Sequence, residues 1–171
     1  MPGDAVRRGG RWRPVSGADL ELAVDVAAPP ERTWQAVTDW ARQGEWMLGT
    51  TVRVTGGDGR SVGSTLAART GFGPVGFVDT MEITEWDPAR RRAVVAHTGW
   101  LVRGDGEFAV TPRAGGGSVV HWTERLQLPF GVLGQAGWPL LRPVFAAGVR
   151  WSLHRLARFC TDYPGERQAR R

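Results

Sequence analysis

Hydrophobic residues recur with two different periods along this chain. In segment 138–163 they recur every three or four positions, which places them on one side of a helix. That side carries Phe145, Val149, Ser152, Leu153, Leu156, Phe159 and Cys160. Pro139 and Pro143 suit a helix start after the glycine-rich run 131–137, and Tyr163-Pro164 ends the helix. The pattern predicts an amphipathic helix of about 20 residues, roughly 30 Å long, that needs a broad apolar surface.

The chain opens with one strand and two short helices. Apolar and polar residues alternate over 20–26, which predicts a strand with one solvent-exposed face. Pro29 and Pro30 then open a helix. A second short helix is expected over 40–43, capped by Thr38 or Asp39.

Beyond these helices the period shortens from 3.6 to 2. Six short alternating segments follow, separated by turns rich in glycine or aspartate: 51–55, 61–70, 75–86, 91–98, 106–111 and 118–128. With the first strand they make seven, and strands joined by short turns pair antiparallel in a sheet that curls. The fold class is therefore expected to be α+β. If the long helix lies on the concave face, the layer between the two is a candidate cavity.

Composition places the excess charge at the two ends of the chain. All 22 basic residues are arginines; seven of them, and two of the 17 acids, lie in tails 1–17 and 164–171. The remainder, 18–163, is a single expected domain with 15 arginines and 15 acids. We therefore expect disordered basic tails that contact an anionic surface only weakly, and no specific nucleic-acid partner. The oligomeric state is left open.

The N-terminus and the hydropathy pattern bear on location. No run approaches 18 apolar residues, and the first residues lack the charged and then apolar order of a signal peptide. A cytoplasmic location is the expectation. The lone Cys160 excludes an internal disulfide.

Four stretches carry a resemblance to a known superfamily. They are VAAPPERTWQAVTDW at 26–40 with GEW at 44–46, VGS at 62–64, EWDP at 85–88, and GGSVVHWTE at 116–124. Over 18–162 the chain resembles the START-like or SRPBCC superfamily, in particular its polyketide cyclase/dehydrase-like branch. The resemblance implies a helix-grip fold, in which a curved seven-stranded antiparallel sheet wraps around the long C-terminal helix, with two short helices after strand 1.

The resemblance also implies a hydrophobic small-molecule ligand, such as a lipid, a polyketide or an isoprenoid, in a cavity under the long helix. The alternative is a polyketide aromatase/cyclase-type enzyme that uses pocket carboxylates, and the sequence leaves the choice open. The candidate ligand-binding residues are Trp40, Trp46, Met47, Met81, Trp100, Trp122, Phe145 and Val149. Core packing explains most of them equally well; the family pattern adds support for Trp46 and Trp122.

Three side chains are candidates for acid–base chemistry. If Met81 faces inward, the period of two places Asp79 inward as well. The alternative is that Asp79 lies at the open end of its strand, in contact with water. Glu124 shares a face with Trp122, which makes it a second pocket acid. His97 is a possible general base. The alternative, a structural histidine that is hydrogen-bonded or exposed, stays open because the alternation in its strand does not decide which face points inward.

Other chemistries find little support. The three histidines and one cysteine show no metal-ligand spacing, so no metal site is expected. Residues 71–76 match GxGxxG, but a strand pattern follows where a dinucleotide site needs a helix. There is no phosphate-binding loop and no GxSxG motif, and no cofactor is expected.

Overall fold

The computed structural model describes residues 18–127 and 132–164. Its elements, in chain order, are β1 (Ala18–Val26), α1 (Pro30–Val37), η1 (Trp40–Glu45), β2 (Thr50–Gly56), β3 (Thr65–Phe72), β4 (Val75–Asp87), β5 (Arg92–His97), β6 (Arg103–Pro112), β7 (Ser118–Gln127) and α2 (Val132–Asp162). The expected α+β order is confirmed. Apart from Pro164, the two basic tails lie outside the described residues, as does Leu128.

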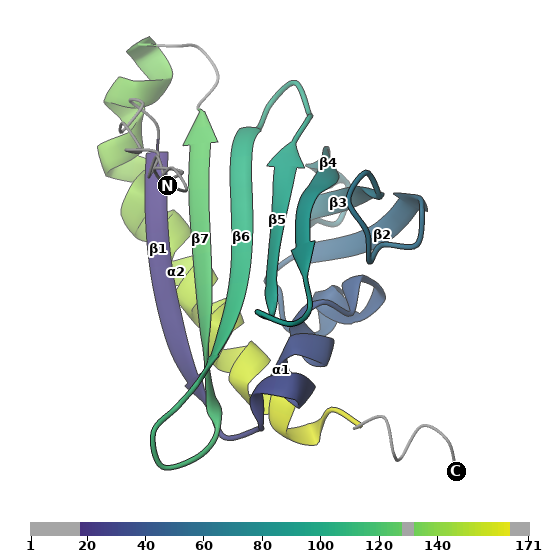
Figure 1. Cartoon of the computed structure of the whole chain (residues 1–171). Helices are drawn as coiled ribbons and strands as arrows, with labels where there is room; N and C mark the ends of the chain where they lie inside the picture. Colours follow the sequence, from purple (N-terminus) through teal and green to yellow (C-terminus); the bar gives the residue numbers. More distant parts are fainter. Residues whose placement is uncertain (1–17, 128–131, 165–171) are drawn as a thin grey trace, which may run out of the picture.

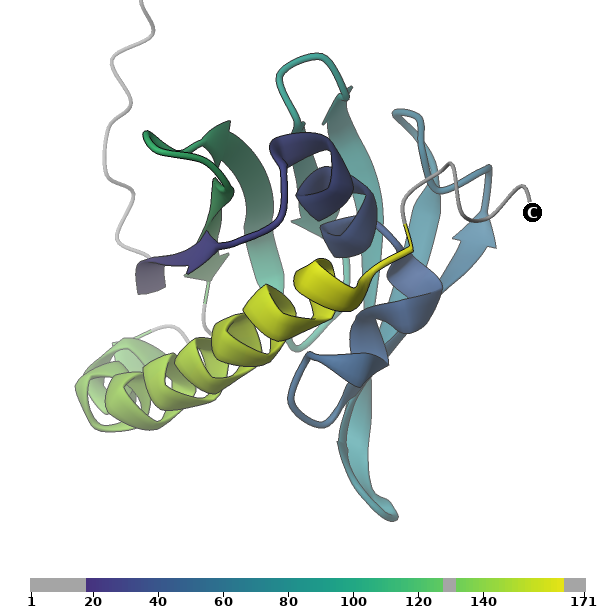
Figure 2. The same ribbon diagram turned by 90° about the horizontal axis from the view of Figure 1, so that it is seen from below.

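The seven strands form one antiparallel sheet in the order β1-β7-β6-β5-β4-β3-β2. The chain begins at one edge, crosses to the other through α1 and η1, and returns strand by strand until β7 pairs with β1 (Figure 1). The twist of antiparallel strands curls the sheet, and α2 runs along its concave side (Figure 2). The expected helix-grip architecture is confirmed.

The apolar side of α2 packs as its period predicts. Val149, Leu153, Leu156 and Cys160 are at most 6% exposed and belong to a core that also includes α1, β1 and β7. Among the described residues, no helix is both long and apolar enough to cross a membrane.

The predicted start of the long helix is wrong. It begins at Val132 and not near Trp138, which gives it 31 residues with Pro139 and Pro143 inside. A proline favours the first turn because its missing N–H is not needed there, and inside a helix it removes a hydrogen bond. Both prolines are solvent exposed, whereas Val149 and Leu153, further along α2, are buried.

Two local predictions also need correction. The strand expected from residue 61 begins at Thr65, because residues before it form a turn around Asp58, whose Oδ1 accepts hydrogen bonds from Arg60 N (2.8 Å) and Ser64 Oγ (3.1 Å). The second short helix is a 3-10 helix without a side-chain cap. Its flanking carboxylate, Asp39, instead accepts a hydrogen bond from the Tyr163 hydroxyl at 2.7 Å.

Candidate functional site

A cavity of about 360 Å³ lies between the concave face of the sheet and α2. Its lining takes residues from two apolar clusters of the described residues, such as Trp122 and Val149 from one and Leu66 and Met81 from the other. Its volume falls within the range of about 300–1,000 Å³ that is usual for small-molecule sites, and its mainly apolar lining is usual for them too.

Six of the eight predicted ligand-binding residues line this cavity: Trp40, Met47, Met81, Trp122, Phe145 and Val149. Trp46 does not, because it is fully buried behind the wall, with its ring edge-on to Trp122 at 5.9 Å. Trp100 does not either, since it lies 79% exposed in the loop between β5 and β6. Tryptophans of this chain therefore occur in the core, in the cavity wall and at the surface, so an aromatic side chain does not by itself indicate a ligand-binding residue.

The sequence reasoning missed several lining residues. These are mainly Gln43, Thr50, Val52, Leu66, Ala68, Phe72, Phe77, Val95, Gly106, Phe108, Leu126 and Ser152. The alternation of the strands could have identified some of them. Val52, Leu66 and Phe108 lie on the same inner face of the sheet as Met81 and Trp122. Gln43 lies three residues after Trp40, on the same side of η1.

At one end of the cavity, three titratable side chains from three strands meet. Asp79 comes from β4, His97 from β5 and Glu124 from β7. The His97 Nδ1 lies 2.5 Å from Asp79 Oδ2, and its Nε2 lies 3.3 Å from Glu124 Oε2. The indole N–H of Trp122 donates to Glu124 Oε1 at 2.6 Å. The structure thus brings together all three predicted acid–base candidates; we call them the Asp79–His97–Glu124 cluster.

Strand pairing explains this convergence. Met81 pairs with His97 across β4 and β5, so Asp79, two residues before Met81, lies diagonally beside the imidazole on the same face. Glu124 is one strand further away, across β6, where it pairs with Gly106. A Cβ at Gly106 would lie 3.3 Å from both Glu124 carboxylate oxygens and from His97 Nε2. Glycine at this inward position therefore leaves the room in which His97 and Glu124 meet.

Burial and charge act on His97 in opposite directions. Burial lowers the pKa of the imidazole, but hydrogen bonding and charge attraction from Asp79 and Glu124 outweigh it and raise the pKa to about 10. A carboxylate oxygen lies within 3.3 Å of each imidazole nitrogen, and a neutral imidazole has only one N–H to offer the two. The geometry and the direction of the shift both indicate a protonated His97 at neutral pH.

Part of the cluster lacks hydrogen-bond partners. Within the described residues, Asp79 Oδ1, His97 Nε2 and Glu124 Oε2 are buried and have none, although the last two face each other. Asp79 is 6% exposed and Glu124 9%. Buried polar atoms of this kind need an explanation, and a bound molecule or water supplies one. In the same part of the chain, no three His, Cys, Asp or Glu side chains are arranged to hold a metal ion.

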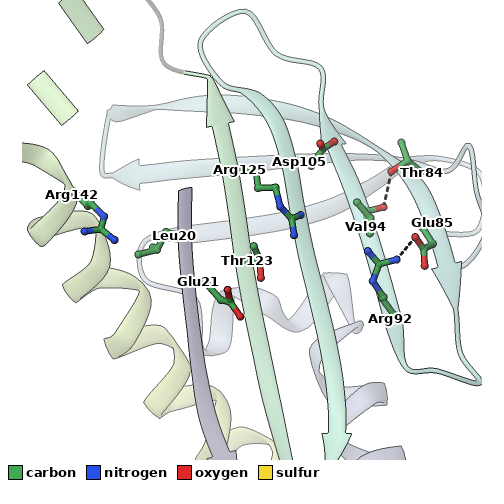
Figure 3. A pocket seen from close by; sticks show the side chains of 10 residues that line it. All are labelled: Leu20, Glu21, Thr84, Glu85, Arg92, Val94, Asp105, Thr123, Arg125 and Arg142. Carbon is green, nitrogen blue, oxygen red and sulfur yellow. Dashed lines mark hydrogen bonds and ion pairs between the residues drawn. The ribbon is translucent and has the colours of Figure 1, made fainter. Parts of the chain in front are cut away.

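A second hollow, of about 790 Å³, lies on the outer face of the sheet and is lined mostly by polar side chains (Figure 3). Two of its arginines, Arg92 and Arg125, take part in ion pairs. Arg92 contacts Glu85 and also donates to Glu107 at 2.9 Å, and Arg125 lies 3.4 Å from the same Glu107. This network ties neighbouring strands together, so we place the candidate functional site in the apolar cavity.

Comparison with known proteins gives a family and a fold. Residues 17–160 match the family described as polyketide cyclase / dehydrase and lipid transport. The structure is similar to the protein TTHA0849 from Thermus thermophilus, with a TM-score of 0.73 and 17% identity, covering 86% of this chain and 100% of that one. It is also similar to the Zhui aromatase/cyclase from Streptomyces sp. R1128, with a TM-score of 0.68 and 17% identity over 84% of this chain and 93% of that one.

A third similar structure is the di-domain ARO/CYC protein BexL from the BE-7585A biosynthetic pathway, with a TM-score of 0.66 and 17% identity. The alignment covers 84% of this chain and 46% of that one. No sequence among the curated proteins compared matches this chain. At these identities the structural likeness shows a shared fold.

Proposed function

Because this chain belongs to the polyketide cyclase/dehydrase and lipid transport family, we propose that it binds a hydrophobic small molecule, such as a lipid, polyketide or isoprenoid, in the cavity under α2. The observation that carries this proposal is the cavity of about 360 Å³ with its mainly apolar wall. Burial of apolar surface contributes about 25 cal/mol per Å², so a ligand that fills such a space gains most of its affinity from the wall.

The aromatic rings in the cavity wall indicate which ligand shapes fit. Trp122 and Phe108 lie on adjacent strands with ring centroids 5.1 Å apart, and both line the cavity. Trp46 is edge-on to both rings, at 5.9 and 6.1 Å, which holds them in place. Flat or branched apolar ligands fit such a preorganised surface because little side-chain freedom is lost on binding.

The first test is native mass spectrometry of the protein purified from its own host, followed by denaturing extraction of whatever travels with it. A co-purifying apolar compound at a fixed stoichiometry is the expected result. A protein that neither carries nor takes up any apolar compound would contradict the proposal.

A pair of variants locates the ligand. Trp122→Ala removes a cavity wall and should weaken binding of the identified compound at least tenfold, whereas the exposed Trp100→Ala should leave its affinity unchanged within about twofold. Equal affinities of the two variants would place the ligand elsewhere.

A second candidate function is acid–base catalysis on a polyketide-like substrate, of the aromatase/cyclase type. The observation that favours it is the convergence of Asp79, His97 and Glu124 at one end of an apolar cavity, with the pKa of His97 raised to about 10. Titratable groups with shifted pKa values inside a cleft are typical of catalytic sites, although structural ion pairs shift pKa values too.

The two functions make different predictions for the same variants. Asp79→Asn and Glu124→Gln keep the shape of each side chain and remove its acid–base capacity. Turnover of a substrate should fall at least a hundredfold in either variant if the cluster is catalytic. Full turnover in both variants would contradict a catalytic role of the cluster, whereas variants that still bind the apolar ligand but turn no substrate over at the wild-type rate would support it.

A further inference from the structure

The charge of the Asp79–His97–Glu124 cluster restricts what the cavity can bind. Two carboxyl groups flank a single imidazole, so the cluster holds more acidic groups than basic ones. Among the described residues that line the cavity, none is an arginine, and the chain has no lysine. No cation other than His97 is therefore present in this lining to receive an anionic ligand.

The unpartnered atoms of the cluster are mainly acceptors. Asp79 Oδ1 has no hydrogen-bond partner in the described residues, and Glu124 Oε2 has only the His97 Nε2 at 3.3 Å, outside hydrogen-bond geometry; both oxygens belong to side chains that line the cavity. A buried carboxylate oxygen without a donor is costly, and a ligand that supplies the donor gains a charge-assisted hydrogen bond. A ligand carboxylate at the same place would bring another acceptor and another negative charge next to the carboxylates of Asp79 and Glu124, which disfavours its binding.

We propose that this end of the cavity is an acceptor site, which takes the hydroxyl group of an aromatic or enolic ligand and rejects ligands that end in a carboxylate. This inference rests on the proposed binding function and names its ligand class. The aromatic wall of Trp122 and Phe108 faces the ring of such a ligand, while Glu124 accepts from its hydroxyl. Free fatty acids, which are as apolar but end in an anion, are excluded by the same geometry.

Gly106 leaves the cluster open to such a hydroxyl. A Cβ at this position would lie 3.3 Å from Glu124 Oε1, from Glu124 Oε2 and from His97 Nε2, closer than most Cβ contacts. Since glycine has no side chain, the junction between His97 and Glu124 is not covered from β6. Gly106→Ala therefore narrows the acceptor site and leaves the aromatic wall intact.

Three matched probes test the inference by calorimetric titration of the full chain at neutral pH. They share one ring system: 2-naphthol carries a donor, 2-methylnaphthalene carries no polar group, and 2-naphthoate carries an anion. We expect 2-naphthol to bind about tenfold more tightly than 2-methylnaphthalene, which is the contribution of one hydrogen bond to a charged group. We expect 2-naphthoate to bind at least tenfold more weakly than 2-naphthol.

The three affinities separate two kinds of failure. If none of the probes binds, the proposed binding function itself is contradicted. If 2-methylnaphthalene binds but 2-naphthoate binds as tightly as 2-naphthol, the cavity is real and the acceptor site is refuted.

Variants assign the selectivity to the cluster. Glu124→Gln removes the charged acceptor at nearly constant shape and should reduce the advantage of 2-naphthol over 2-methylnaphthalene to within about twofold. Glu82→Gln, the same exchange at an exposed position on β4, is the matched control and should keep the advantage. Gly106→Ala is the second variant, available if Glu124→Gln does not fold, and should weaken 2-naphthol several-fold more than 2-methylnaphthalene. An unchanged preference in both cluster variants would overturn the inference.

Discussion

His97 should make the stability of this protein fall with rising pH, and His97→Gln should remove that dependence. Its pKa is about 10 in the folded protein against about 6.5 in an unfolded chain. Below pH 6.5 both states hold the proton, and the stabilisation from the two carboxylates is fully present. Between these two pKa values the folded state keeps the proton and the unfolded state loses it. The free energy of unfolding therefore falls by about 1.4 kcal/mol per pH unit in this window.

Urea denaturation of both proteins between pH 6.5 and 9 measures the effect. From pH 7 to 9 the wild type should lose about 2.5 kcal/mol of unfolding free energy more than His97→Gln does. Burial raises the pKa values of the Cys160 thiol and the Tyr163 phenol to about 12, and the slope that titration of these groups in the unfolded state adds is common to both proteins and cancels in their difference. His154→Gln, on the exposed side of α2, controls for the loss of a histidine outside the cluster.

Parallel pH profiles for the wild type and His97→Gln would refute the reasoning, because they would mean that His97 is neutral in the folded protein. If His97→Gln does not fold, Glu124→Gln provides the second measurement. It removes one of the two groups that raise the pKa of His97, so stability should stop falling at a lower pH than in the wild type. A profile that matches the wild type would count against the charged cluster equally.

Three further predictions concern packing and the outer face of the sheet. Trp122→Ala should lower the free energy of unfolding in urea by about 3–5 kcal/mol, because it empties part of a buried wall. Leu156→Ala, at a fully buried position on α2, should cost about 2–5 kcal/mol, whereas Trp100→Ala should change stability by less than about 0.5 kcal/mol; similar losses in both would contradict the burial described. The hydrogen bond from Arg92 lowers the pKa of Glu107, so its stabilisation is present above the ordinary glutamate pKa and is lost as pH falls through the lowered value. Arg92→Gln should flatten that acid loss of stability in thermal melts, and an unchanged acid profile would argue against the pair.

Local periodicity was sufficient to predict most of the architecture. The alternation in β7 placed Trp122 and Glu124 on the inner face, and the structure has both lining the cavity. The three- and four-residue spacing in the last helix identified Val149 and Leu156 as buried. These predictions hold because side-chain direction follows directly from helix and strand geometry.

Predictions about where the long helix begins and about which tryptophans line the cavity were less accurate. Pro139 and Pro143 suggested a late helix start, yet the helix begins at Val132 and includes both. Trp46 and Trp100 shared the aromatic identity of the wall residues but lie in the core and at the surface. Residue type alone cannot distinguish these environments, because an indole suits all three.

The sequence by itself therefore determined the order of elements, the inner face of β7 and the list of candidate acids, but not the inner face of β5. Only the tertiary structure decided that Asp79, His97 and Glu124 meet, because their contact depends on the pairing of β4 with β5 and on the space that Gly106 leaves across β6. Register between strands depends on which faces are buried and on the turns that join the strands, so the meeting of three strands on one face cannot be read from any single segment. The charge of the site, and with it the proposed preference for a hydroxyl over a carboxylate, follows from that register.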